Sequence, residues 1–217
     1  DMYGIDKVLG DRLPLVQIPT TAGTGSEVTP IAIVTTGATT KSGIVARQLY
    51  ADMAILDAEL TLGLPPHITA ATGIDAMVHA IEAFTSARLK NPLSGHLAIK
   101  ALQLLAGNLV EVCRHGANVQ AREAVLLGAM LAGQAFANAP VAAVHALAYP
   151  LGGVFHLPHG LSNALVLPHV LRFNAEAAAP HYAALADALL PGTGGDHHAK
   201  TAAFITHIEA LITATQM

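Results

Sequence analysis

The sequence predicts an α+β protein that is mostly α, with a short α/β segment followed by an all-helical domain. Apolar and β-branched runs bounded by proline, glycine and threonine are confined to about the first 60 residues. After Leu64-Pro65-Pro66 the chain consists of long stretches rich in alanine and leucine. We therefore place a boundary near residues 60–66 and expect domains at 1–62 and 63–217.

Three short apolar segments are predicted to be the strands of the α/β segment. They cover residues 13–19, which we expect to be buried, 31–36 and 54–57. The segment 20–30 between the first two is rich in threonine and glycine, which is typical of a loop.

The later part of the chain is predicted to be helical. The predicted helices cover residues 68–85, 92–115, 121–138, 141–148, 175–190 and 197–215. Gly116 and the proline- and glycine-rich segment 191–195 are credible helix stops.

Composition restricts the classes of partner. Charged residues make up only 12% of the chain and the formal net charge is −4, which argues against a nucleic acid or an anionic membrane. Residues 124–171 contain no Asp, Glu, Lys or Arg, but interrupting polar residues and prolines favour a buried helix pair over a membrane span. A single cysteine, Cys113, and no secretory signal indicate a cytoplasmic protein.

Four residues have the pattern of a metal site. Asp75 and His79 are four residues apart, so a helix places them on one face. His145 lies in the uncharged stretch, and His159 is expected at a Pro-His-Gly turn after it. Three imidazoles and a carboxylate suit Fe(II) or Zn(II) better than Mg(II) or Ca(II). A lone histidine on an apolar helix is more often a core residue, so spacing alone leaves both interpretations open.

The loop TTAGTGSE is the second candidate site. Gly23 and Gly25 would let the backbone approach a ligand, but position 28 is valine, so the dinucleotide pattern GxGxxG fails. An ordinary loop between strands is the alternative. The loop also has hydroxyl side chains that could donate to a ligand: Thr20, Thr21, Thr24 and Ser26.

Five stretches together resemble the iron-containing (group III) alcohol dehydrogenases. They are PTTAGTGSE (19–27), AILDAEL (54–60), LPPHITAATGIDAMVHAIEAF (64–84), NAPVAAVHALAYPLGG (138–153) and FHLPHGLSNALVLPHVLRFN (155–174). They follow the family's order over nearly the whole chain, and the last three are highly specific. The resemblance implies the architecture shared with dehydroquinate synthases, in which part of a dinucleotide-binding α/β domain precedes an all-helical metal-binding domain.

The resemblance also assigns roles to individual residues. The implied metal ligands are Asp75, His79, His145 and His159. The implied nucleotide contacts in the loop are Thr20, Thr21, Gly23 and Thr24. Lys41 matches a lysine near the cofactor ribose, and Phe136 matches a residue that lines the substrate pocket. Many relatives have a histidine four residues after the third ligand, where this chain has Tyr149, a candidate proton relay.

The activity implied is reversible hydride transfer between a small alcohol, aldehyde or ketone and NAD or NADP, with Fe(II) or Zn(II) polarising the substrate oxygen. A homodimer or higher homo-oligomer is also implied. The alternatives are an oxidoreductase of the same fold, similar to glycerol dehydrogenase or maleylacetate reductase, or a metal-binding domain without turnover. The family's glycine-rich pyrophosphate segment and last helices have no match, so we expect a chain that is incomplete at both ends.

Overall fold

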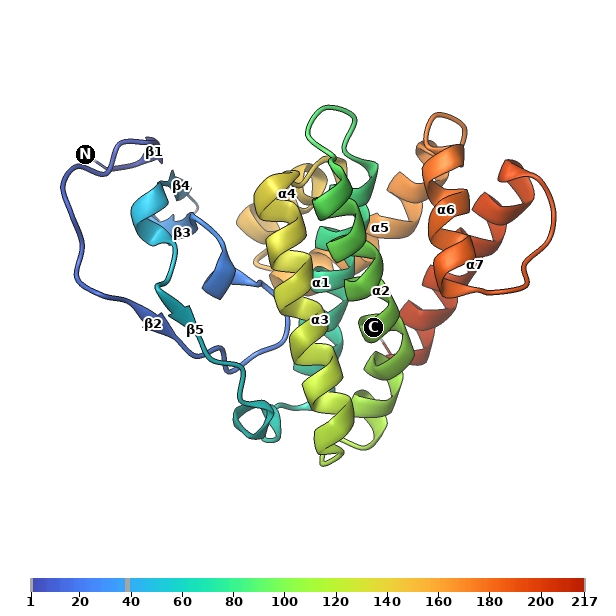
Figure 1. Cartoon of the computed structure of the whole chain (residues 1–217), viewed down its shortest axis with the longest axis horizontal. Coiled ribbons are helices and arrows are strands. Elements are labelled where there is room, and N and C mark those ends of the chain that lie inside the picture. Colours follow the sequence, from blue (N-terminus) through green and yellow to red (C-terminus); the bar gives the residue numbers. More distant parts are fainter. Residues whose placement is uncertain (1, 38–39, 217) are drawn as a thin grey trace.

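A computed structural model describes residues 2–37 and 40–216. A region of small sheets and short 3-10 helices precedes a bundle of α-helices that begins at Pro66 (Figure 1). This confirms the mostly helical α+β architecture expected from the sequence.

The described residues of the N-terminal region form two small sheets. One has the strand order β1-β4-β3, with β1 (Gly4–Ile5) parallel to β4 (Lys41–Val45) and β3 (Ile31–Thr35) antiparallel to β4. The other is the parallel pair of β2 (Val16–Gln17) and β5 (Met53–Ala54). Three 3-10 helices lie between the strands and before the bundle: η1 (Ser26–Val28), η2 (Arg47–Leu49) and η3 (Ala58–Thr61).

Two strand predictions are wrong in part. The segment 13–19 was expected to be a buried strand, but only Val16–Gln17 pair, and Leu13 is 85% exposed. The reason is that β5 is its one paired neighbour in the described residues, so most of its apolar surface stays uncovered. The predicted strand 54–57 ends at Ala54, because the Asp57 side chain accepts a hydrogen bond from the backbone N–H of Glu59 and caps η3.

The bundle is built from α1 (Pro66–Thr85), α2 (Pro92–Arg114), α3 (Val119–Asn138), α4 (Ala143–Phe155), α5 (His159–Phe173), α6 (Ala179–Leu189) and α7 (His197–Ala214). Local sequence starts several of these helices. Asn91 and Ser94 form a capping box on α2, and the side chains of Asn118 and Asp196 accept backbone N–H groups at the starts of α3 and α7.

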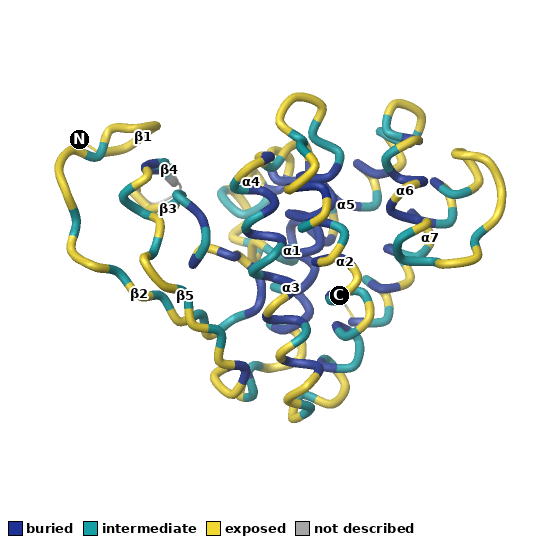
Figure 2. The backbone as a smooth tube through the Cα atoms, viewed as in Figure 1, coloured by how far each residue is buried: buried dark blue, intermediate teal, exposed yellow. Residues whose placement is uncertain are grey.

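Helix α1 is the central element of the bundle. It packs against α2, α3 and α5, and Figure 2 shows its backbone buried along most of its length. Ile74 and Met77 of α1 are fully buried with Leu102 and Leu105 of α2 in one apolar core. Because α1 is enclosed, its polar side chains must find their partners inside the protein.

The chain between residues 141 and 173 differs from its prediction. The helix expected at 141–148 continues through Pro150 to Phe155. Pro150 has no N–H to donate to the carbonyl of Ala146, but Ala146 is exposed to solvent, so water can take the place of this donor. His159, which was expected in a turn, is instead the first residue of α5, and Pro158 occupies the N-cap position.

Judged by length and composition alone, helix α2 could cross a membrane, and so could the bent pair of α3 and α4 if it is counted as one span. A core helix of a globular domain meets the same criterion. Leu102, Leu105 and Leu109 of α2 are part of the apolar core.

Candidate metal centre

Helix α1 supplies three buried polar side chains on one face. Asp75, His79 and Glu82 follow one another at spacings of four and three residues, which stack along a helix. All three are at most 5% exposed. Two carboxylates are therefore removed from water within two turns of the same helix.

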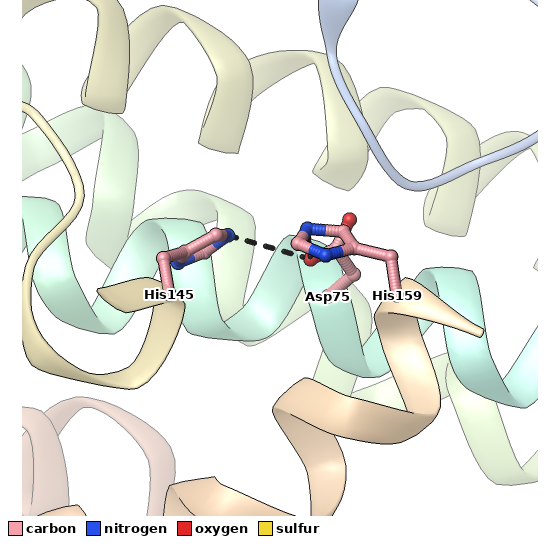
Figure 3. Close-up of side chains that lie close together, drawn as sticks. All are labelled: Asp75, His145 and His159. Carbon is pink, nitrogen blue, oxygen red and sulfur yellow. Dashed lines mark ion pairs between the residues drawn. The ribbon is translucent and has the colours of Figure 1, made fainter. Parts of the chain in front are cut away.

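Two further histidines approach this face from neighbouring helices. His145 is the third residue of α4, and His159 is the first residue of α5 (Figure 3). Both rings point toward the Asp75 carboxylate in Figure 3. The His159 side chain is 42% exposed, so the cluster opens toward solvent on that side.

One carboxylate oxygen lies at the centre of the cluster. The Oδ1 atom of Asp75 is 3.8 Å from Nε2 of His79, 3.5 Å from Nε2 of His145 and 3.4 Å from Nε2 of His159. One ligand atom from each of Asp75, His145 and His159 lies within 4.8 Å of the others. His79 is not part of this group of three, but its ring stacks on that of His145 with 4.8 Å between ring centroids. The structure thus brings together the four residues that the sequence singled out.

Electrostatics favour a cation in this cluster. Burial alone would raise the pKa of Asp75, but the charges of the surrounding histidines hold it well below its usual range. Burial lowers the pKa of His79 to about 4. Burial also opposes charge on His145, yet hydrogen bonds and charges from Asp75 and Glu82 outweigh it and raise its pKa to about 9. The site therefore stabilises a positive charge between two carboxylates.

Two polar residues that the sequence reasoning missed complete the cluster. The carboxylate of Glu82 lies 2.7 Å from Nδ1 of His145. The side-chain amide of Asn163 donates to Oδ1 of Asp75 at 2.5 Å, and its nitrogen is 3.3 Å from Nε2 of both His145 and His159. Helical spacing was the signal for both, because Glu82 is three residues after His79 and Asn163 is four after His159.

The residues present fit a divalent metal ion. Nδ1 of His79 and Oδ1 of Asn163 are buried without a hydrogen-bond partner among the described residues. Among the described residues, Asp75 and Glu82 form ion pairs with histidines only. Buried carboxylates are stabilised by a cation, and nitrogen donors with one carboxylate suit Fe(II) or Zn(II).

Two other predicted residues lie beside the cluster. The ring of Phe136 packs on His79 with 4.4 Å between ring centroids, and Phe136 is largely buried. The ring of Tyr149 lies 6.1 Å from that of His159, and half of Tyr149 is exposed. Burial and the charges of Asp75 and Glu82 raise the pKa of Tyr149, so its phenol stays a hydrogen-bond donor at neutral pH.

The threonine-rich loop forms a separate cleft of about 330 Å³. Thr20, Thr21 and Thr24 line it. Gly23 does not: it is buried against α1, and a β-carbon there would lie 2.6 Å from Cβ of Thr72. The side chain of Lys41, at the start of β4, lies outside the described residues.

Comparison with known proteins identifies the family. Residues 69–217 match the sequence model of the Fe-containing alcohol dehydrogenase family, C-terminal, and residues 1–58 match that of iron-containing alcohol dehydrogenase. This chain belongs to the iron-containing alcohol dehydrogenase family. The matched range 69–217 contains every member of the metal cluster.

Several named proteins are similar to this chain in sequence and in fold. The chain is 45% identical to long-chain-alcohol dehydrogenase 1 of Geobacillus thermodenitrificans over 91% of this chain and 47% of that protein. The crystal structure of a 1,3-propanediol oxidoreductase superposes with a TM-score of 0.94 at 38% identity, covering 99% of this chain and 56% of the other. Sulfoacetaldehyde reductase from Bifidobacterium kashiwanohense, solved in complex with NAD+, superposes with a TM-score of 0.86 at 32% identity, covering 95% and 53%.

The chain spans about half the length of these relatives. The similarity therefore establishes the family and the fold of the described part of the chain.

Proposed function

We propose that this chain binds one divalent metal ion, Fe(II) or Zn(II), through Asp75, His79, His145 and His159. The whole protein is then a metal-dependent alcohol dehydrogenase that transfers a hydride reversibly between a small alcohol, aldehyde or ketone and NAD or NADP. The observation that carries this proposal is the placement of one Asp75 oxygen at 3.4 to 3.8 Å from Nε2 of three histidines.

The roles of the residues follow from their surroundings. When bound, the metal supplies Lewis acidity toward the substrate oxygen, and the nicotinamide accepts or gives the hydride. Asp75 and His79 hold the buried side of the site, whereas His159 borders the side that opens to solvent. Phe136 covers His79 and excludes water from that side. Tyr149, beside His159, is placed to donate a hydrogen bond to a substrate oxygen or a water molecule.

The cofactor role of the N-terminal region is supported by its cleft and by a relative solved with NAD+. Thr20, Thr21 and Thr24 supply hydroxyl groups for a nucleotide, and Gly23 shapes the loop through its contact with α1. We also propose that residues 1–62 are part of a nucleotide-binding domain and that residues 63–217 are the metal-binding catalytic domain. Lys41 would lie near the cofactor ribose.

The remaining proposals concern partners and location. Relatives named as alcohol dehydrogenases and reductases support a small alcohol or aldehyde as the substrate. The low charge supports a protein that binds neither nucleic acid nor membrane surfaces. We propose a cytoplasmic homodimer or higher homo-oligomer.

Metal analysis tests the site. The chain loaded with Fe(II) and freed of excess metal should retain about one metal per chain, since one cluster holds all four proposed ligands. His145→Ala should retain none at metal concentrations that saturate the wild type. His115→Ala is the matched control, because His115 is an exposed histidine that pairs with Glu111. Full metal retention by His145→Ala would remove His145 from the site.

Nicotinamide binding tests the catalytic proposal. A second candidate is a metal-binding domain that does not turn over by itself, because the metal cluster lies wholly within residues 75–163 and apart from the threonine-lined cleft. Calorimetric titration of the metal-loaded chain with NAD and NADP separates the two. Cofactor binding that is weakened by Thr20→Ala and Thr24→Ala supports the dehydrogenase. Stoichiometric metal without any cofactor binding supports the second candidate for this chain.

A further inference from the structure

Glu82 is a buried carboxylate whose two oxygens both accept hydrogen bonds. Its Oε1 accepts the backbone N–H of Val144 at 2.7 Å. Its Oε2 accepts the backbone N–H of Ala142 at 2.8 Å and lies 2.7 Å from Nδ1 of His145. Glu82 is only 4% exposed, so these contacts replace its hydration.

These contacts hold the beginning of α4 in place. Ala142, the N-cap residue of α4, makes no capping hydrogen bond with its own side chain. Glu82, which lies on α1, caps α4 instead, because its oxygens accept N–H groups that have no partner within α4. A carboxylate at a helix N-terminus is also favoured by the helix dipole. The backbone that carries His145 is therefore placed by Glu82.

The same carboxylate determines which nitrogen of His145 can bind a metal. A carboxylate only accepts hydrogen bonds, so Nδ1 of His145 must carry the proton in this contact. In the neutral ring, Nε2 then has the free lone pair. That atom is 3.5 Å from Oδ1 of Asp75, within the proposed site.

We propose that Glu82 is the positioning residue that makes His145 a metal ligand, by holding the start of α4, the ring orientation and the Nδ1–H tautomer. This inference rests on the proposed metal site. Glu82 would also supply a second negative charge next to a ligand of the metal, through its contact with His145. Carboxylates that hold ligand histidines in this way raise the basicity of the ring, and their loss weakens metal affinity.

Glu82→Gln is the informative variant, because it keeps the size of the side chain. An amide has one accepting oxygen, whereas both oxygens of Glu82 accept backbone N–H groups. If the NH2 group takes the place of Oε2, it donates to Nδ1 of His145 and moves the ring proton to Nε2. If it takes the place of Oε1, it faces the N–H of Val144. Either arrangement disturbs the ligand.

The matched control is Glu111→Gln. Like Glu82, Glu111 contacts Nδ1 of a histidine: its Oε2 lies 3.1 Å from Nδ1 of His115. This contact, however, is on the protein surface. The variant tests the loss of a Glu–His contact outside the metal site.

The experiment measures Co(II) and Zn(II) binding to the full chain by competition with a chelator, together with the visible spectrum of the Co(II) form. We expect Glu82→Gln to weaken the affinity about 10- to 100-fold and to change the Co(II) spectrum at saturation, because His145 is lost or displaced. Glu111→Gln should match the wild type in both. If Glu82→Gln only lowers the melting temperature, with affinity and spectrum unchanged, Glu82 is a helix cap and the inference is wrong.

A measurement on the wild type avoids dependence on the folding of the variant. Nitrogen-15 NMR of histidine in the Zn(II)-loaded chain should show His145 protonated at Nδ1 and bound to zinc through Nε2. Binding through Nδ1 would overturn the inference. Failure of the wild type to bind either metal would instead overturn the proposed metal site itself, so the two failures are distinguishable.

Discussion

Gly160 of α5 lies directly against the backbone carbonyl of Ala71 of α1, so close that a β-carbon at position 160 would overlap with it. This contact brings the first turn of α5 onto α1 one turn before Asp75. It therefore sets the position of His159, the residue next to Gly160, relative to the Asp75 carboxylate. A glycine with no ligand atom of its own thus determines the geometry of the cluster.

Gly160→Ala should destabilise the chain and weaken metal binding. The added methyl group must push α5 away from α1, and such overpacking costs about 1–3 kcal/mol. Denaturant unfolding and metal competition measure the two effects. Gly107→Ala is the control, since Gly107 lies at an exposed position of α2 where an added β-carbon would meet open space. That change should stabilise the helix by about 0.5–1 kcal/mol. Equal stability of both variants would contradict the close packing.

Asn163→Leu should destabilise the metal-free chain by about 1–2 kcal/mol, because Asp75 loses a buried hydrogen bond to its charged carboxylate. The unfolding free energy in the presence of a chelator measures the effect. Asn138→Leu, which removes an exposed amide that contacts Gln134, should change it by no more than about 0.5 kcal/mol. A loss at Asn163 no greater than at Asn138 would show that the hydrogen bond to Asp75 contributes little.

Metal loading should raise the melting temperature, since an ion that binds only the folded chain stabilises it by mass action. At a free metal concentration of 100 times Kd the gain is about 2.7 kcal/mol, or roughly 5–10 °C for a chain of this size. Chelation should reverse the shift, and His145→Ala should show none. Differential scanning calorimetry with Zn(II) measures it. A shift of the same size in His145→Ala would place the stabilising metal elsewhere.

Stability should fall in acid as Asp52 becomes protonated. Hydrogen bonds from Arg12 and from the backbone N–H of Leu15 lower the pKa of Asp52 to about 2. Because this pKa lies below the unfolded value, the contribution is present above about pH 4 and is lost as the pH falls toward about 2. The stability difference between wild type and Asp52→Asn should therefore shrink between pH 5 and pH 2 in denaturant titrations. A difference that is constant over this range would contradict the assigned ion pair.

Much of the helical region could be predicted from local sequence. The starts of α2, α3 and α7 depend on capping side chains close in sequence, at Asn91, Asn118 and Asp196. The pairing of Asp75 with His79 likewise depends only on helical spacing. The proline rule failed in α4, which continues through Pro150 because Ala146, whose carbonyl loses its N–H partner, is exposed to water.

The sequence by itself determined the helical character of the chain, the Asp75/His79 pair and, through resemblance, the two further histidines. Only the tertiary structure decided that His145 and His159 meet at Asp75 and that Glu82 and Asn163 hold them there. Glu82 is 63 residues from His145, and Asn163 is 88 residues from Asp75. Contacts at such separations depend on how whole helices pack, including the close approach of Gly160 to Ala71, which no local periodicity encodes.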